Sequence, residues 1–528
     1  MPVKEETMPE VKRPHSIEER MKELERRRLT VRKGGGDERI EKQHKAGKLT
    51  ARERVDKLVD PGSFQEIGLF ARHRAVLFGM AEKEMPADGV VTGCATVDGR
   101  IVHLASQDFT VAGGAAGEVH CDKIVEMMNA SLKTGSPFVF INDSGGARVQ
   151  EGIDSLSGYG RVFYNNVMLS GTVPQVSLIC GPCAGGAAYS PALTDFIIQT
   201  RAAQMFITGP SVIKQVTGEV VTADQLGGPN AQMNNSGVIH FIAESDEEAV
   251  YTCRRLLSFL PSNNLEDPPR LQPDPGLDLS PEFNKIVPPS SKQAYDVRDV
   301  IRGVLDFQDF MEVQDGFAQN IVIGFGRVQG RSVGIIANQP KVLAGALDIN
   351  ASDKASRFIR FCNAFNIAIL TFVDVPGFHP GVQQEYGGII RHGAKMLFAY
   401  SAATVPKITI VLRKAYGGAY LAMCSKDLGA DRVIAWPTAE IAVMGAEGAV
   451  EVVFKKEIDA SKNSAKRRQE LIDEYRDTFA NPYVAAGRQL VDDIIEPSET
   501  RRYVAAALEA LGGKRELRPP KKHGLMPL

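Results

Sequence analysis

The sequence lacks an excess of either charge and has no long apolar run. Its 528 residues include 62 Lys and Arg against 64 Asp and Glu. A balanced charge without basic blocks argues against nucleic-acid binding. No apolar run reaches the roughly 18–20 residues needed to span a bilayer, and the charged N-terminal stretch does not fit a secretory signal. We therefore expect a cytoplasmic protein without a membrane span.

Cysteine is also scarce. The seven cysteines are scattered and odd in number, which favours reduced thiols over a disulfide framework. Cys180-Gly-Pro-Cys183 has the Cys-x-x-Cys spacing of a redox-active dithiol. A second glycine turn follows it directly, and the single Trp436 lies far away along the chain, so its context does not fit a redox site. No paired Cys-x-x-Cys knuckles occur, so a zinc ribbon is not indicated. We expect no metal on this chain.

What the sequence does contain is one long pattern that occurs twice. Five landmarks recur after 231 or 232 residues: Arg100 and Arg331, Gln107 and Gln339, Lys123 and Lys354, Asp143 and Asp374, and Gly185 and Gly417. This spacing far exceeds the roughly 20–50 residues of a solenoid repeat. It predicts a duplicated domain, and two similar domains can bind two similar ligands.

The domain organisation follows from this duplication. We place the first domain at 1–260, with a polar helical arm at 1–33, and the second at 290–528. The proline-rich segment 261–289 between them is predicted to be a stiff linker, because proline fixes its own φ angle. Each half is long enough to bury its own core.

Short apolar strands, glycine turns and helices alternate in both halves. Apolar strands are expected at 137–142 and 173–180, and again at 367–373 and 405–412. Continuous apolar strands between helices are typical of a sheet covered on both faces. The sequence therefore predicts an α/β fold in two tandem domains.

Glycine pairs follow two of these strands, at Gly185-Gly186 and at Gly417-Gly418. Glycine lets the backbone turn without a Cβ in the way, and the first amides of the next helix lack intrahelical partners. Such a loop can stabilise a developing oxyanion. Tight packing of helix on sheet also selects glycine, so this pattern alone leaves both interpretations open.

Several long strings make the chain recognisable. They begin at Ala105, Asp143, Gly181, Val375, Gly387, His392 and Ala415, and read ASQDFT, DSGGARVQEG, GPCAGGA, VPGF, GGIIR, HGAK and AYGGAY. The chain resembles the carboxyltransferase β subunits of biotin-dependent acyl-CoA carboxylases. This group includes propionyl-CoA carboxylase β, the methylmalonyl-CoA transcarboxylase central subunit and methylmalonyl-CoA decarboxylase α. The resemblance runs from about Gly34 to the C-terminal region.

The resemblance implies two crotonase-like domains (the ClpP/crotonase fold), each of which binds a different reactant. The first domain binds acyl-CoA, and the second binds carboxybiotin carried on a partner protein. Carboxyl passes between biotin N1′ and the α-carbon of the acyl thioester. By this resemblance Gly185 and Gly186 hold the thioester oxygen, and Gly418 and Ala419 hold the ureido oxygen of biotin. No side chain in these loops can take the α-proton, which in the family passes to biotin.

Further site residues are assigned by the same resemblance. The CoA side comprises Lys123, Gly145, Gly146, Ala147 and Arg148, and the biotin side comprises Pro376, Gly377, Phe378 and Arg391. Two of these assignments leave alternatives open. Arg148 either meets a CoA phosphate or pairs with a neighbouring carboxylate, and Arg391 either serves biotin or forms a surface ion pair. Lys123 and Lys354 are duplicated, so at least one is expected to be structural.

Leu421 is expected to help select the acyl group, because it follows the second glycine loop directly. Related propionyl-CoA enzymes can carry Asp at this place, so the exact acyl-CoA stays open between branches of the family. Ordinary helix packing is the alternative role.

The resemblance also implies partners. The chain contains neither an ATP-grasp region nor the Met-Lys-Met motif of a biotin carrier, so a biotin carboxylase and a biotin carrier protein or domain are expected as partners. The family assembles as homo-oligomers, commonly hexamers, with active sites between subunits. Two other functions compete: the decarboxylase α subunit of a membrane sodium pump, and a biotin-independent crotonase-type hydratase or isomerase.

Overall fold

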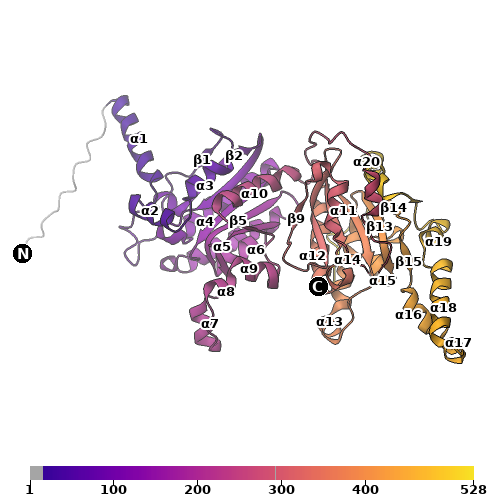
Figure 1. Ribbon diagram of the computed structural model, residues 1–528. Coiled ribbons are helices and arrows are strands. Elements are labelled where there is room, and N and C mark those ends of the chain that lie inside the picture. Colours follow the sequence, from indigo (N-terminus) through magenta and orange to yellow (C-terminus); the bar gives the residue numbers. More distant parts are fainter. Residues whose placement is uncertain (1–15, 292, 528) are drawn as a thin grey trace, which may run out of the picture.

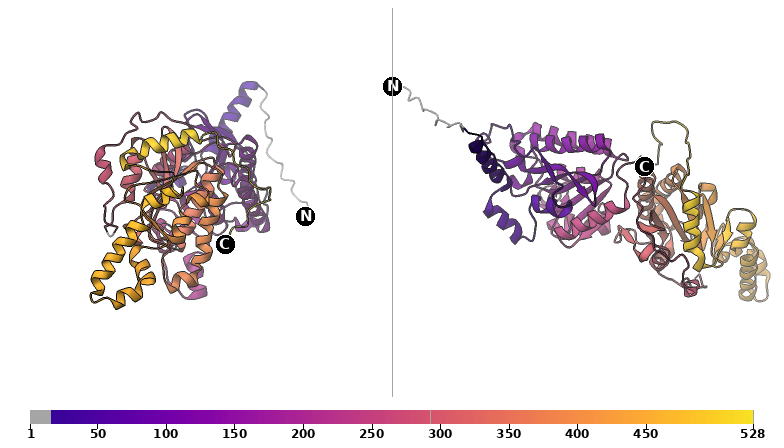
Figure 2. Two further views of the ribbon diagram at one scale, coloured as in Figure 1. Left: turned by 90° about the vertical axis from the view of Figure 1, so that its right-hand side faces the viewer. Right: turned by 90° about the horizontal axis from the view of Figure 1, so that it is seen from above.

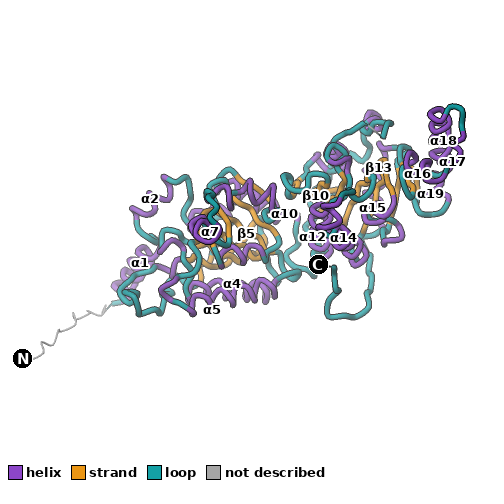
Figure 3. The backbone as a smooth tube through the Cα atoms, turned by 90° about the horizontal axis from the view of Figure 1, so that it is seen from below, coloured by secondary structure: helices purple, strands orange, loops and turns teal. Residues whose placement is uncertain are grey.

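The computed structural model describes residues 16–291 and 293–527. The chain forms two similar halves, each built around one twisted sheet (Figure 1). Views along two further directions show the halves side by side, with helices covering the sheets (Figures 2 and 3). The predicted arm is helical over α1 (Ile17–Arg32), where Ser16 and Glu19 form a capping box. Residues 1–15 of that predicted arm lie outside the described residues.

The first sheet has the order β1-β2-β3-β4-β5-β6-β8, with β7 paired to β5. Its strands are β1 (Gln65–Ile67), β2 (Val90–Val97), β3 (Arg100–Gln107), β4 (Phe138–Ser144), β5 (Gln175–Ala184), β6 (Phe196–Thr200), β7 (Gln204–Phe206) and β8 (Phe241–Ala243). The helices of this half are α2 (Asp37–Lys45), α3 (Ala51–Leu58), α4 (Glu118–Thr134), α5 (Ile153–Leu169), α6 (Gly186–Ala192), α7 (Pro210–Thr217), α8 (Ala223–Gly227), α9 (Pro229–Ala231) and α10 (Asp246–Phe259).

The second sheet repeats this arrangement in the order β9-β10-β11-β12-β13-β14-β16, with β15 paired to β13. Its strands are β9 (Met311–Val313), β10 (Ile321–Val328), β11 (Arg331–Asn338), β12 (Ala368–Val375), β13 (Lys407–Tyr416), β14 (Arg432–Ala435), β15 (Glu440–Ala442) and β16 (Asp493–Ile494). The helices are α11 (Val297–Val304), α12 (Ile349–Ala364), α13 (Val382–Gly387), α14 (Ile389–Ala402), α15 (Gly417–Ala422), α16 (Ala446–Val453), α17 (Lys455–Ala460), α18 (Ser464–Thr478), α19 (Pro482–Gly487) and α20 (Thr500–Ala510).

The strand pairing shows where the repeat shifts from 231 to 232 residues. Phe138 on β4 pairs with Gln175 on β5, and Ile369 on β12 pairs with Lys407 on β13. Residues on β4 are therefore offset by 231 from their counterparts and residues on β5 by 232, so the second half has one more residue between these two strands. The register shift near the strand ends, where Ser144 pairs with Cys183 and Val375 with Ala415, is the same in both halves. The predicted α/β fold with a duplicated domain is confirmed.

The two halves share a continuous apolar core at their junction. The Phe196 ring packs edge-on against Phe361 with centroids 4.7 Å apart, and Phe259 stacks on Phe325 at 5.9 Å. The guanidinium of Arg327 lies 3.9 Å from the centroid of Phe259. Because these rings come from both halves, burial of their apolar surface fixes one half against the other.

The sheets meet edge to edge at this junction. The backbone N–H of Gln314, just after β9, donates to the carbonyl of His240, just before β8, at 3.0 Å. The proline-rich segment then runs along the second half, where Leu271 N–H donates to Gly330 O at 3.0 Å. Asp274 of the same segment pairs with Arg501 at 3.2 Å.

Candidate active site

The two glycine turns stand at equivalent places, at the carboxyl ends of β5 and β13. Gly185 has φ 61° and precedes α6, and Gly417 has φ 58° and begins α15. Left-handed backbone of this kind favours glycine because a Cβ would crowd the carbonyl group. Ligands of open α/β sheets bind at the carboxyl ends of the strands, so both turns are well placed for a site.

The backbone hydrogen bonds differ among the amides assigned from the sequence. The N–H of Gly185 donates to the carbonyl of Phe206 at 3.1 Å, so this amide already has a partner within the chain. Its role is to turn the backbone into α6. With the offset of 232, the counterparts of Gly418 and Ala419 are Gly186 and Ala187. As first residues of α6, these two have N–H groups without an acceptor one turn earlier in the helix.

The space in front of the second turn is open. A Cβ built on Gly418 would meet no atom within 4 Å, and Gly418 is exposed. A Cβ on Gly186 would lie 3.3 Å from the ring of Tyr159 on α5. The second turn therefore leaves room for a ligand group against its backbone, and the first turn is bounded on one side by an aromatic ring.

A second loop lies beside each glycine turn, after the neighbouring strand. Gly145 to Arg148 follow β4, and Pro376 to His379 follow β12 at an offset of 231. Ala116 bridges Ala147 in the first half, as Leu347 bridges Phe378 in the second. The predicted CoA-side and biotin-side segments are thus the same structural loop in two halves. A Cβ on Gly146 would approach the carbonyl of Ala184 to 2.9 Å, so this loop lies directly against the start of the first glycine turn.

Arg148 and Lys123 do not offer their charges to a ligand. Arg148 is 2% exposed, and its guanidinium pairs with Asp88 at 2.6 Å and Glu151 at 2.7 Å. Of the two roles considered for Arg148, the structure therefore favours the ion pair. Lys123 is buried, and its ammonium donates to the carbonyl groups of Ala87 and Val90. Burial lowers the pKa of Lys123 to about 8.

Lys354 has the same structural role in the second half. Its ammonium donates to the carbonyl groups of Gln314, Phe317 and Ile321 at 2.9, 2.6 and 2.9 Å. Burial lowers its pKa to about 7. Both duplicated lysines therefore hold backbone segments together, which is the structural role expected for at least one of them.

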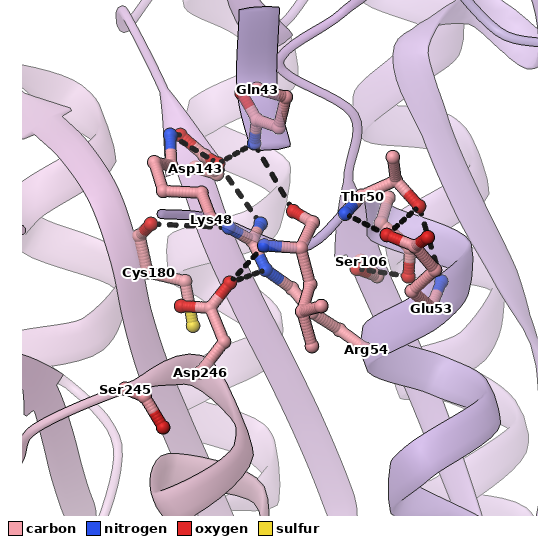
Figure 4. Close-up of polar contacts among 12 residues, drawn as sticks. Gln43, Lys48, Thr50, Glu53, Arg54, Ser106, Asp143, Cys180, Ser245 and Asp246 are labelled. Atoms are coloured by element: carbon pink, nitrogen blue, oxygen red, sulfur yellow. Dashed lines mark hydrogen bonds and ion pairs between the residues drawn. The ribbon is translucent and has the colours of Figure 1, made fainter. Parts of the chain in front are cut away.

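A buried polar cluster fixes the end of β4 (Figure 4). The carboxylate of Asp143 accepts from Lys48 at 2.8 Å, Gln43 at 3.0 Å and Arg54 at 2.9 Å. Arg54 also donates to Asp246 at 2.7 Å. Because Asp143 directly precedes Ser144-Gly145-Gly146, this cluster sets the position of the loop. No local sequence pattern predicts this cluster, because its members come mostly from α2, α3, β4 and α10, which lie far apart along the chain.

The second half holds the equivalent Asp374 differently. Arg413 on β13 donates to its carboxylate at 3.0 Å, and the backbone N–H of Lys414 donates to it at 3.2 Å. Burial raises the pKa of Asp374, against the opposing effect of the Arg413 charge. The loop after β12 is therefore positioned from within its own sheet.

The remaining predicted residues lie at the rim of the second half. Phe378 is half-buried, and its ring fills the space beside Gly393 of α14, where an added Cβ would lie 2.8 Å from it. Arg391 is exposed at the start of α14, with Nη2 3.3 Å from Nε2 of His392. It forms no ion pair within the described residues, so its charge is free to meet a ligand. Leu421 is 41% exposed on α15, three residues after Gly418.

The cysteine pair is not a redox centre. Cys180 and Cys183 are both buried in β5, and burial raises the pKa of both thiols. Thiols with raised pKa are poor nucleophiles because little thiolate forms.

Within residues 16–291 and 293–527, no group of three His, Cys, Asp or Glu side chains has a metal-binding arrangement. In the same ranges, no helix is long and apolar enough to cross a membrane.

Comparison with known proteins decides the family. Residues 42–526 match the Carboxyl transferase domain. This chain belongs to that family. The carboxyltransferase is 61% identical over 512 residues to the methylmalonyl-CoA carboxyltransferase 12S subunit of Propionibacterium freudenreichii subsp. shermanii, covering 97% of this chain and 98% of the relative.

Two further relatives cover nearly the same length. The carboxyltransferase is 56% identical to methylmalonyl-CoA decarboxylase subunit alpha of Veillonella parvula, over 97% of this chain and 100% of the relative. It is 52% identical to the propionyl-CoA carboxylase beta chain of Cereibacter sphaeroides, over 96% of this chain and 99% of the relative.

A solved structure gives the same result. The carboxyltransferase superposes on crystalline transcarboxylase 12S with a TM-score of 0.96 and 60% identity, covering 98% of this chain and 100% of that one. That structure is a hexamer assembly with methylmalonyl-coenzyme A and methylmalonic acid bound. The likeness in fold confirms the two crotonase-like domains expected from the sequence.

Proposed function

We propose that this carboxyltransferase moves a carboxyl group between N1′-carboxybiotin on a carrier protein and the α-carbon of propionyl-CoA, forming methylmalonyl-CoA, or runs the reverse reaction. The observation that carries the proposal is the pair of equivalent glycine turns, Gly186-Ala187 and Gly418-Ala419. Relatives at 61% and 52% identity carry the names methylmalonyl-CoA carboxyltransferase and propionyl-CoA carboxylase. Two equivalent turns can each bind one oxygen atom: the thioester oxygen of the acyl-CoA and the ureido oxygen of biotin.

In the first half, the backbone N–H groups of Gly186 and Ala187 stabilise the thioester oxygen as negative charge develops on it. Donors fixed in place before the reaction lower the barrier because they need no reorganisation. The exposed backbone of Gly145 and Ala147 lies beside this turn and borders the path of the CoA chain.

In the second half, Gly418 and Ala419 face the ureido oxygen of biotin. The open space at Gly418 fits such a group, since a Cβ there would fill it. When bound, biotin supplies the carboxyl group and accepts the α-proton. Pro376, Gly377 and Phe378 border this place, with Arg391 at the rim.

The site is proposed to lie between two copies of the chain. Figure 1 shows α6 in the first half and α15 in the second, with the junction between the halves. Exposed apolar side chains flank both turns: Ile153 and Leu156 on α5, and Tyr386 and Ile390 on α13 and α14. Apolar patches of this kind mark contact surfaces. We infer that the α5 face of one copy meets the α13–α14 face of another, in a hexamer like that of transcarboxylase 12S.

This assembly is testable with one charged substitution. Ile390 is 80% exposed, so Ile390→Glu is expected to preserve the fold, dissociate the oligomer and abolish transfer. Leu265→Glu is the matched control, because Leu265 is equally exposed but far from both turns along the chain. Light scattering reports the mass. An active monomer of about the chain mass, 57.4 kDa, would refute the shared site.

A second candidate function uses the same half-reaction as a decarboxylation within a membrane complex. The 56% identity to methylmalonyl-CoA decarboxylase subunit alpha, over 97% of this chain, favours keeping it. The two candidates differ in the partner that acts on the biotin: a biotin carboxylase loads the carboxyl group onto it, whereas a membrane decarboxylase subunit releases the group from it as carbon dioxide. Co-purification with a biotin carboxylase or with a membrane decarboxylase subunit distinguishes them.

The direct test uses the purified chain alone. With free biotin and methylmalonyl-CoA, we expect release of carbon dioxide and formation of propionyl-CoA without ATP. Omission of biotin is the control. Turnover that ignores biotin, or that requires ATP with this chain alone, would overturn the proposal.

A further inference from the structure

A cavity of about 620 Å³ lies at the junction of the two halves, apart from both glycine turns. The first half contributes Phe196 and His240 at the edge of its sheet, and the second half contributes Phe358 and Phe361 on α12 and Ile323 on β10. This volume lies within the range of small-molecule sites, roughly 300–1,000 Å³. Aromatic and apolar side chains from both halves therefore form part of the wall, and charged side chains form the rest.

One ring nitrogen of a buried histidine in this wall makes no hydrogen bond within the described residues. His240 is 6% exposed, and its Nδ1 accepts the backbone N–H of Ile197 at 3.1 Å. A peptide nitrogen is always the donor, so Nδ1 carries no proton and the neutral ring carries it on Nε2. This Nε2–H has no hydrogen-bond acceptor within the described residues. Burial, and then the Arg357 charge, lower the pKa of His240 well below its usual range, which keeps the ring neutral.

Two arginines on one face of α12 border the same cavity. Arg357 donates across the junction to the carbonyl groups of Thr194 at 2.7 Å and Asp195 at 3.1 Å. Arg360 contacts only the sulfur of Met526, at 3.2 Å. Neither guanidinium forms an ion pair with a carboxylate within the described residues. An arginine without a carboxylate partner is well suited to bind an anion.

The other charged groups of the cavity are already engaged. Asp353 pairs with Lys395 and His392, each at 2.8 Å. Lys354 is saturated by backbone carbonyl groups. The carboxylate of Asp195 accepts the N–H of Gln175 at 2.9 Å, and burial raises its pKa to about 6. The balance of unpaired charge in the cavity is therefore positive.

We propose that this junction cavity binds a small organic anion with a phosphate or carboxylate head and an apolar body. The head lies between the guanidinium groups of Arg357 and Arg360 and the Nε2–H of His240. The body lies against the rings of Phe358 and Phe361. Because both halves contact the ligand at once, binding stabilises their junction.

The test measures binding of 2-naphthyl phosphate to the purified full-length oligomer by calorimetry. We expect one site per chain. Arg360→Gln is expected to weaken binding about tenfold, the effect of losing one charge-assisted hydrogen bond, and Arg360→Lys less. Arg488→Gln, which removes an exposed arginine directly after α19, is the matched control and leaves binding unchanged. 2-Naphthoate in a parallel titration distinguishes a phosphate from a carboxylate site.

Two further ligands test the two parts of the proposal. Inorganic phosphate lacks the apolar body and 2-naphthol lacks the charge, so each is expected to bind at least about tenfold more weakly. Cryo-electron microscopy of the wild-type oligomer with 2-naphthyl phosphate locates the ligand without any variant. Density elsewhere, unchanged affinity in Arg360→Gln, equal affinity for 2-naphthol, or no binding at millimolar concentration would overturn the proposal.

Discussion

Gly185 and Gly417 turn the chain in the same left-handed conformation, with φ of 61° and 58°, at the starts of equivalent helices. Each turn brings the next two backbone N–H groups to the carboxyl end of its sheet. The backbone of the two turns is equivalent, but the side chains around them differ. The ring of Tyr159 bounds the first turn, whereas the space in front of the second turn is open. This difference makes the second turn the better place to test the chemistry.

Gly418→Val is expected to abolish carboxyl transfer while leaving the fold intact. A Cβ at Gly418 meets nothing within 4 Å, so the side chain intrudes only on the space proposed for the biotin oxygen. Loss of one such donor slows comparable reactions about 10²–10³-fold. Thermal unfolding and turnover are measured together, with Gly513→Val as the control at another open glycine. Wild-type turnover in folded Gly418→Val would refute the assignment.

Arg148→Gln is expected to destabilise the protein rather than to weaken CoA binding selectively. Its buried guanidinium pairs with Asp88 and Glu151, and breaking a buried pair costs about 3–5 kcal/mol. Denaturant-induced unfolding measures the loss. If stability were unchanged and only KM for acyl-CoA rose, Arg148 would be a ligand-binding residue after all. Arg201→Gln is a useful comparison, because Arg201 pairs with Glu244 on the surface.

Leu421→Asp is expected to change the order of preference among acetyl-, propionyl- and butyryl-CoA. Leu421 is partly exposed on α15, beside the open turn at Gly418. An apolar side chain favours longer acyl tails by about 0.8 kcal/mol for each buried methylene, and Asp removes that advantage. The ratios of kcat/KM between the three substrates are the measurement. A uniform fall with unchanged ratios would mean that Leu421 only packs.

Stability is expected to rise with pH through Lys354. Burial lowers the pKa of Lys354 from 10.5 to about 7. Between these values the unfolded chain binds more protons than the folded chain, so the free energy of unfolding increases as pH rises. The contribution is fully present above pH 10.5 and is lost as pH falls through about 7. Its slope is at most about 1.4 kcal/mol per pH unit.

The difference in unfolding free energy between wild type and Lys354→Met, measured from pH 7 to 9, isolates this contribution. Both proteins share every other titrating group, so only Lys354 makes the difference vary with pH. A constant difference across this range would contradict the lowered pKa.

Much of the fold could be read from the sequence because its signals are local. The apolar strands at 137–142 and 405–412 begin β4 and β13 within two residues of the observed bounds. Thr50 caps α3 through a capping box with Glu53, as its position before a helical pattern indicates. The repeat itself predicted the equivalence of Gly185 and Gly417.

The rest depended on contacts between distant segments. The sequence suggests that β5 ends at Cys180, but the register shift lets Cys183 pair with Ser144 and extends the strand to Ala184. Arg54 reaches Asp143 and Asp246 across 89 and 192 residues. No local pattern marks such partners. The sequence also could not show that the N–H of Gly185 is engaged, because its acceptor, the carbonyl of Phe206, lies 21 residues further along the chain.

The two sheets meet edge to edge where the N–H of Gln314 donates to the carbonyl of His240. The two halves have the same fold, but each contributes a different edge of its sheet to this contact. The last strand of the first sheet lies beside the first strand of the second, so the contact is heterologous, a geometry that by itself can be continued without limit. The two outer strands end this series. β1 has three residues and β16 has two, and short edges offer little backbone for another sheet to pair with. The chain is therefore a two-unit segment of an otherwise open series, with β1 and β16 as its two free edges.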